Sequence, residues 1–275
     1  MRTRTLLLAL AVLCALPAAA LAKTETASSG PVTATLTYDV DSSGFDATNV
    51  RLAIARSGST VFDQAVPEPC NQCAVVPAGL QSGVNSLQIK DLDADGEPEV
   101  LFDMYTGGAH CCSFTWIYRF NGSTYAGTPA VWGNAGYTLK DLDGNGTLEL
   151  RSFDDSFAYE FTDYADSAFP PLIYSFRAGA LTDVTRSFPK IVSGDAKVQL
   201  RRYKRLRHRR DIRGVVAAYV ADEYLLGKQA KGLALANLAN RRGDLNGLGR
   251  GDTWPRNGKF IRTLKKFLRK KGYAG

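Results

Sequence analysis

Apolar and polar residues alternate over three stretches between Val32 and Val66. These stretches are VTATLTYDV (32–40), VRLAIARSG (50–58) and TVFDQAV (60–66). A period of two places the apolar side chains on one face of an extended chain, which is typical of β-strands with one buried side. The next segment, PEPCNQCAVVPAG (67–79), is interrupted by prolines and predicts a loop.

A repeat follows. LQIKDLDADGEPEVLF (87–102) matches YTLKDLDGNGTLELRS (137–152) at an offset of fifty positions, and WIYRFNGSTYAGT (116–128) is similar to LIYSFRAGALTDVT (172–185). Each unit predicts a strand, an acidic loop, a second strand and a hairpin with a Gly-containing turn, at Asn121-Gly122 and Ala178-Gly179. A period near fifty is typical of propeller blades. Two units plus the N-terminal strands are too few for a closed propeller, so we expect an open, partial propeller or a sandwich.

Beyond Pro189 the apolar residues change to helical spacing. The segments are AKVQLRRYKRLRH (196–208), IRGVVAAYVADEYLLG (212–227), GLALANLANRRG (232–243) and GKFIRTLKKFLRKKG (258–272). In the second segment one stripe is predicted, formed by Val215, Val216, Tyr219, Val220 and Tyr224. Gly227, Gly243 and Gly272 predict helix ends. The fold class is therefore α+β: mainly antiparallel β repeats followed by a small C-terminal helical region.

The repeated loops concentrate oxygen donors. In DLDADGEPE the candidate ligands are the side chains of Asp91, Asp93, Asp95 and Glu99 and the carbonyl of Glu97. In DLDGNGTLE they are the side chains of Asp141, Asp143, Asn145 and Glu149 and the carbonyl of Thr147. Hard oxygen donors select Ca²⁺ over transition metals, so the sequence predicts two calcium sites. Without a cation, so many carboxylates in one turn would repel one another.

These loops are not EF-hands, because the twelfth position holds Phe102 or Ser152 instead of a bidentate Glu. The first loop has four carboxylates and the second has three, so we expect the first to bind more tightly. The alternative is an ordinary Asp/Gly turn whose carboxylates only accept hydrogen bonds from backbone amides.

At these residues the chain resembles the FG-GAP or VCBS-type repeats of integrin α-chain propellers and of many secreted bacterial proteins. The similarity covers residues 81–190 and implies calcium held in hairpin loops of propeller blades. The chain departs from the repeat in its few copies, in Asn145 in place of an Asp, and in TGGAHCC (106–112). DLDADGEPEV together with YTGGAHCC also resembles a group of uncharacterised exported bacterial proteins, and this resemblance implies no activity.

The N-terminus predicts export. MRTRT, the apolar run LLLALAVLCAL and the small residues Ala20 and Ala22 form a secretory signal peptide over residues 1–22, so the mature chain is expected to be secreted. No later stretch approaches 18 apolar residues, and no membrane span is expected in the mature chain.

Four cysteines remain after the leader: Cys70, Cys73, Cys111 and Cys112. In an exported chain they predict two disulfides, each joining Cys70 or Cys73 to one of the adjacent pair, because a bond between neighbouring cysteines is strained. A four-Cys zinc site is the alternative, although its usual spacing is CxxC…CxxC.

The charge is divided sharply. Residues 23–190 carry 10 Lys and Arg against 21 Asp and Glu, a net charge of −11, whereas residues 191–275 carry 22 against 6, a net of +16. This division predicts a β-repeat domain over 23–190 and a basic helical region over 191–275. The basic segments 200–213 and 261–272 suit a polyanion, such as a cell-wall polymer or an anionic surface, or they dock on the acidic sheets. No specific nucleic-acid motif is present.

Candidate catalytic residues are few, and none is assigned. The two histidines are His110 and His208, and the acidic pair Asp154 and Asp155 is the type of pair that glycoside hydrolysis needs. The sequence favours a secreted, non-enzymatic, calcium-stabilised binding or adhesion module. The alternative is an extracellular hydrolase that acts on carbohydrate or another polymer through carboxylates on a sheet face.

Overall fold

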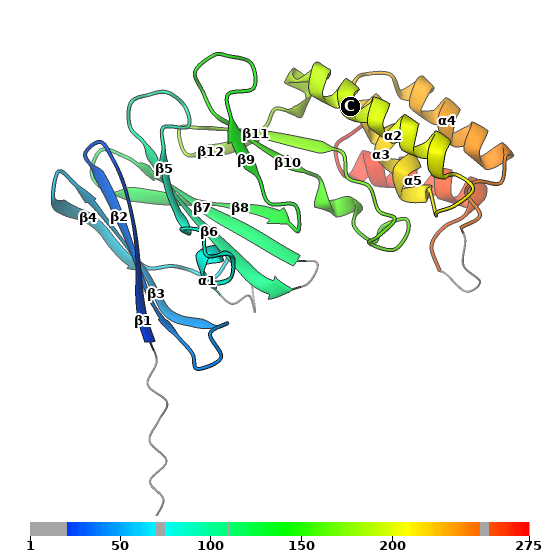
Figure 1. Ribbon diagram of the computed structural model, residues 1–275. Coiled ribbons are helices and arrows are strands. Elements are labelled where there is room, and N and C mark those ends of the chain that lie inside the picture. Colours follow the sequence, from blue (N-terminus) through cyan, green and yellow to red (C-terminus); the bar gives the residue numbers. More distant parts are fainter. Residues whose placement is uncertain (1–20, 70–74, 109–110, 248–252, 275) are drawn as a thin grey trace, which may run out of the picture.

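The computed structural model describes residues 21–69, 75–108, 111–247 and 253–274. It contains three four-stranded antiparallel sheets, each joined in sequence order, and helices toward the C-terminus (Figure 1). The first sheet contains β1 (Leu21–Ser29), β2 (Val32–Val40), β3 (Ala47–Arg56) and β4 (Ser59–Ala65). The second contains β5 (Leu87–Lys90), β6 (Glu99–Gly108), β7 (Cys111–Phe120) and β8 (Tyr125–Gly133). The third contains β9 (Thr138–Lys140), β10 (Glu149–Phe153), β11 (Pro171–Arg177) and β12 (Ala180–Asp183).

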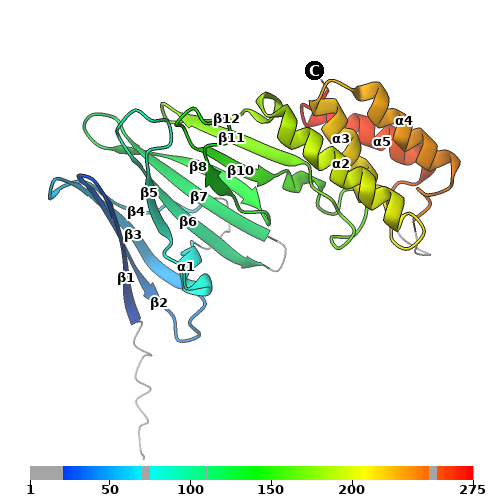
Figure 2. The same cartoon turned by 45° about the horizontal axis from the view of Figure 1, so that its top comes forward.

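The second sheet lies between the other two, as Figure 2 shows. On β6, Phe102 packs in a core shared with the first sheet, whereas its neighbour Leu101 packs with Leu150 and Phe176 of the third. Both faces of β6 are therefore covered, which explains why its sequence is almost continuously apolar instead of alternating. The result is an open stack of β meanders, and the predicted fold class is confirmed.

Strand β1 was not predicted. It pairs with β2 from Leu21 opposite Val40 to Ser29 opposite Val32. Its residues are largely exposed at the edge of the sheet, so they carry no alternating apolar pattern. The strand overlaps the expected leader 1–22 by two residues, and cleavage after Ala22 would leave a strand from Lys23 onward. Residues 1–20 lie outside the described residues.

The predicted helices are present as α2 (Pro189–Leu206), α3 (Arg213–Leu225), α4 (Gln229–Arg241) and α5 (Asn257–Lys270), and a short α1 (Ala78–Ser82) precedes the second sheet. Gly227, Gly243 and Gly272 follow helix ends with φ of 70°, 75° and 79°, as predicted. Among the described residues, no helix has both the length and the apolar composition that crossing a membrane requires.

Helix α3 differs from the predicted one-sided stripe, because every residue from Arg213 to Tyr224 is buried. It is the central helix of the region and contacts α2, α4 and α5. A helix that packs against other elements on all sides has no face exposed to solvent, so it does not show the one-sided apolar pattern of a surface helix.

The segment between β10 and β11, residues 154–170, packs into the helical core. Phe157 lies 4.9 Å from Phe267 and Phe161 lies 5.4 Å from Phe260, measured between ring centroids. These rings lie in one core with the helices, and Figure 1 shows the helices beside the end of the third sheet. A segment that the charge pattern placed with the β-repeats therefore belongs, by packing, to the helical region.

Candidate metal centres in two acidic loops

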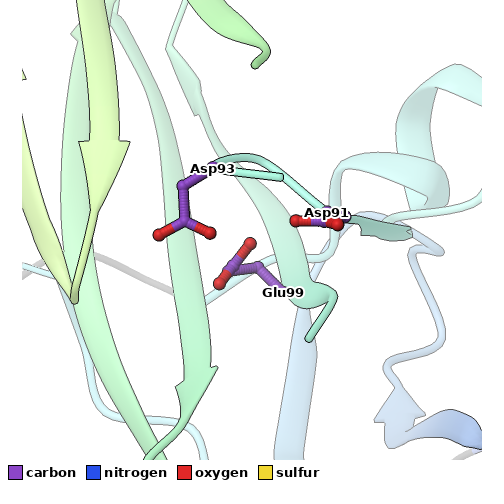
Figure 3. A group of neighbouring side chains, drawn as sticks. All are labelled: Asp91, Asp93 and Glu99. Carbon is purple, nitrogen blue, oxygen red and sulfur yellow. The ribbon is translucent and has the colours of Figure 1, made fainter. Parts of the chain in front are cut away.

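The two acidic loops occupy equivalent places in the second and third sheets, between β5 and β6 and between β9 and β10. In each loop three carboxylates converge: Asp91, Asp93 and Glu99 in the first, and Asp141, Asp143 and Glu149 in the second. One oxygen from each member of a group lies within 4.8 Å of the others. Figure 3 shows Asp93 and Glu99 facing one another, with Asp91 beside them.

Local hydrogen bonds give both loops the same shape. Asp91 accepts hydrogen bonds from the backbone amides of Asp95 and Gly96 at 3.2 and 3.0 Å. Asp141 does the same with the amides of Asn145 and Gly146 at 3.1 and 3.0 Å. The two glycines have φ of 86° and 89°, a left-handed conformation that other residues rarely adopt. The first Asp therefore shapes the turn, as the Asp/Gly-turn alternative expects, while its carboxylate remains within the acidic group.

Glu99 has no exposed surface, because it begins the central strand β6. Its Oε2 accepts a hydrogen bond from the amide of Leu92 at 3.0 Å, but its buried Oε1 has no hydrogen-bond partner among the described residues. Within the same part of the chain, Oδ1 of Asp93 is also buried without a hydrogen-bond partner. Burial, together with the charges of Asp93 and Asp95, raises the pKa of Glu99 to about 7. Buried carboxylate oxygens that lack donors are the arrangement that a bound cation would neutralise.

The second loop repeats this arrangement. Oε2 of the buried Glu149 accepts a hydrogen bond from the amide of Leu142 at 2.8 Å. The hydroxyl of Thr147 lies 3.4 Å from Oε1 of Glu149, but it lies closer, at 2.6 Å, to Oδ1 of Asn145, to which its single proton is donated. The side-chain amide of Asn145 donates a hydrogen bond to the carboxylate of Asp143 at 3.1 Å, and its Oδ1 accepts one from the amide of Thr147 at 2.8 Å.

Asp95, at the fifth position of the first loop, pairs with an arginine and is not part of the converging acidic group. The carboxylate of Asp95 lies 2.9 Å from the guanidinium of Arg119, and Glu97 is paired with Arg56 at 2.6 Å. Arg119 also lies 3.9 Å from Oε1 of Glu99. The structure thus gives both loops three converging carboxylates and places a positive charge beside the first. This removes the basis for expecting tighter binding there.

The first loop also contacts the third sheet. The carboxylate of Asp93 accepts a hydrogen bond from the amide of Ala178, in the β11–β12 turn, at 3.3 Å. The carbonyl of Leu92 accepts one from the amide of Leu148, in the second loop, at 2.9 Å. The shape of the first loop is therefore coupled to the packing of two sheets, which its sequence alone does not indicate.

Other sequence candidates lie elsewhere. Asp154 accepts hydrogen bonds from the amide of Ser156 at 3.0 Å and from the hydroxyl of Tyr273 at 2.7 Å, so both of its oxygens have structural partners. His208 is exposed after the end of α2, and His110 lies outside the described residues. Cys70 and Cys73 also lie outside the described residues, so their pairing with Cys111 and Cys112 stays a prediction.

A further candidate site was missed by the sequence reasoning. Asp103, on β6, lies among aromatic residues at a pocket, and burial raises the pKa of its carboxyl group. A single Asp in an apolar strand is the signal that could have identified it, because a buried acid requires partners.

A comparison with curated proteins finds two relatives. The chain is 35% identical over 167 residues to a probable thylakoid lumen protein of Synechocystis, covering 53% of this chain and 45% of the relative. It is 36% identical over 92 residues to an uncharacterized protein of Sinorhizobium fredii, covering 33% and 15% respectively. The chain thus matches less than half the length of either relative. No family model and no solved structure matches the chain.

Proposed function

We propose that this chain is an exported β-sheet protein whose two acidic loops bind Ca²⁺, and that it acts as a non-enzymatic binding or adhesion module. The observation that carries the calcium proposal is the first loop, where the carboxylates of Glu99 and Asp93 face one another and each has one buried oxygen that accepts no hydrogen bond from the described residues. The matching group of Asp141, Asp143 and Glu149 supports it independently. The resemblance to FG-GAP and VCBS-type repeats agrees with this proposal.

The donor chemistry suits calcium. Ca²⁺ takes six to eight oxygen ligands in a flexible geometry, and three carboxylates with backbone carbonyls and water supply that number. In the first loop the ion would neutralise the charge of Glu99 and hold Asp93, whose other oxygen contacts the third sheet. Calcium would therefore stabilise the stacking of the second and third sheets as well as the loop itself.

Export is supported by the predicted leader and by the name of the Synechocystis relative, which places that protein in the thylakoid lumen. The basic helices support a polyanionic partner. On α5 the apolar residues Phe260, Leu264 and Phe267 are buried, whereas Lys265 and Lys266 are exposed. A helix that buries one side in its own core leaves its basic side available to a partner.

The calcium proposal is tested by calorimetric titration of the chelator-treated mature protein. The wild type is expected to bind two Ca²⁺ ions, Asp93→Ala and Asp143→Ala one each, and the double variant none. Asp46→Ala, an exposed acid in the β2–β3 loop, is the matched control and should retain both sites. Equal melting temperatures with chelator and with Ca²⁺ would contradict a stabilising role for the ion.

The polyanion proposal is tested on a heparin column. Lys265→Gln with Lys266→Gln should elute at lower salt than the wild type, because fewer counterions are released on binding. The control of equal charge is Lys90→Gln with Lys140→Gln, two exposed residues of the second and third sheets. Equal elution of the two double variants would contradict a role for α5.

A further inference from the structure

A pocket of about 430 Å³ lies beside the second sheet. It is lined by α1, by β6 and β7, and by the segment from Trp132 to Tyr137. This volume is in the range of small-molecule sites. Its walls include Tyr105, Phe114 and Tyr137, and Asp103 is the charged side chain among its described lining residues.

The hydrogen bonds around Asp103 define its charge. Its Oδ1 accepts from the hydroxyls of Thr115 at 2.6 Å and Tyr137 at 3.0 Å, and its Oδ2 accepts from the amide of Gln88 at 2.9 Å. Thr115 itself accepts from the indole N–H of Trp132 at 2.8 Å, so its own proton is free to point at Asp103. In each of these hydrogen bonds to Asp103 the carboxylate is the acceptor and the donor is a neutral group. The arrangement therefore fits an ionised Asp103 side chain.

In this arrangement the negative charge of Asp103 has no cation beside it among the described lining residues, and one of its oxygens can accept a further hydrogen bond. Each carboxylate oxygen can accept two hydrogen bonds, and among the described residues Oδ2 of Asp103 accepts one, from the side chain of Gln88. No Lys or Arg is among the described lining residues. Asp103 is half-buried, and a carboxylate that is partly withdrawn from water and held by neutral donors alone is stabilised when a cation joins it.

The aromatic residues suit the same ligand. The ring of Tyr137 stacks on Trp132 at 4.8 Å between centroids, and Trp132 is held from another side by Tyr174 at 5.9 Å. Because Trp132 is 3% exposed, these rings are fixed in place before any ligand binds. Aromatic faces attract cations and pack against apolar groups. An anionic ligand would be repelled by Asp103, and a neutral one would leave its charge uncompensated.

We propose that this pocket binds a small organic ammonium compound, with its ammonium group on Oδ2 of Asp103 and its apolar group against the aromatic walls. The site is separate from the acidic loops, and neither the leader nor the loop motif predicts it. It goes beyond the calcium-binding function, since no metal takes part in it.

Benzylammonium is the probe, and benzyl alcohol is its neutral counterpart of nearly equal size. Binding is followed by tryptophan fluorescence and by saturation-transfer NMR, in a buffer containing Ca²⁺ so that the loops stay in one state. Benzylammonium is expected to bind at least about tenfold more tightly than benzyl alcohol, because a hydrogen bond to a charged group is stronger than a neutral one. Asp103→Asn is expected to abolish this preference.

The control variant is Asp46→Asn, which removes the same charge from an exposed loop and should leave the preference unchanged. If Asp103→Asn fails to fold, the comparison of the two probes on the wild type decides the question. Equal affinity for the two probes, no binding of either at about 10 mM, or an equal loss in Asp46→Asn would overturn the proposal.

Discussion

Replacing Asp222 by Asn is expected to make the protein more stable at neutral pH. Asp222 lies in α3 with no exposed surface, and neither of its oxygens contacts a hydrogen-bond donor among the described residues. Burial, followed by the charge of Asp195 on α2 and a hydrogen bond to it, raises the pKa of Asp222 to about 10. At pH 7 the folded protein therefore keeps a proton on Asp222 and donates it to Asp195.

The size of the effect follows from the difference in the pKa of Asp222 between the folded and the unfolded protein. The ordinary pKa of an Asp is 3.8, and the folded-state pKa is higher. The stability that this group contributes is therefore fully present below pH 3.8. It is lost as the pH rises toward 10, because the unfolded chain releases the proton and the folded chain does not. Each pH unit in this range lowers the free energy of unfolding by about 1.36 kcal/mol, which amounts to about 2.7 kcal/mol between pH 5 and pH 7. An Asn at this position does not titrate and still donates to Asp195.

The assay is urea unfolding followed by far-UV circular dichroism at pH 5, 6 and 7, with chelator present so that the acidic loops are free of metal. The difference in unfolding free energy between Asp222→Asn and the wild type should grow by about 2.7 kcal/mol across this range, since distant titrating groups cancel in the difference. Asp46→Asn is the exposed control and should show no such growth. A difference that stays constant from pH 5 to pH 7 would mean that Asp222 is ionised in the folded state, and the reasoning would be refuted.

Four further substitutions test the charges and the packing of the structure. Arg119→Gln should tighten calcium binding at the first loop and leave the second unchanged in calorimetric titration, because it removes a positive charge 3.9 Å from Glu99; unchanged affinity at the first loop would argue against this. Gly194→Ala, on an open face of α2, should stabilise by about 0.5–1 kcal/mol. Gly214→Ala should instead destabilise in the same urea assay, since its Cβ would lie 2.4 Å from a backbone carbonyl of the 154–170 segment. Phe102→Ala should reduce the unfolding free energy by about 3–5 kcal/mol, as the ring is completely buried between sheets; a loss below about 1 kcal/mol would contradict that packing.

Much of the fold could be predicted from the sequence because the signals are local. The strands β2 to β4 follow a period of two, and the turn at Ala178-Gly179 was predicted from Gly179, which tolerates its φ of 82°. The edge strand β1 could not be predicted, because an exposed edge needs no apolar alternation. The buried face predicted for α3 was too narrow. How many other elements surround a helix depends on the whole fold, so the sequence of α3 alone does not show that all its sides are covered.

The candidate calcium ligands divide in the same way. The backbone amides that donate to Asp91 and Asp141 lie within five residues of each Asp in the sequence. The loop motif therefore determines those turns without help from the rest of the fold. The partner of Asp95 is 24 positions away, on Arg119, and depends on how β7 pairs with β6. For this reason the motif indicates which carboxylates can converge, but it does not indicate the positive charge that the structure places beside the first loop.

The sequence by itself therefore determined the repeat, the acidic turns, the helix ends and the division of charge, since each depends on residues close together in the chain. Only the tertiary structure decided that the second sheet is enclosed on both faces, that aromatic residues surround Asp103, and that Asp222 meets Asp195. The physical reason is that desolvation and charge pairing act between groups that packing brings together, and the energy of a buried carboxyl group depends on those neighbours more than on its own position in the sequence.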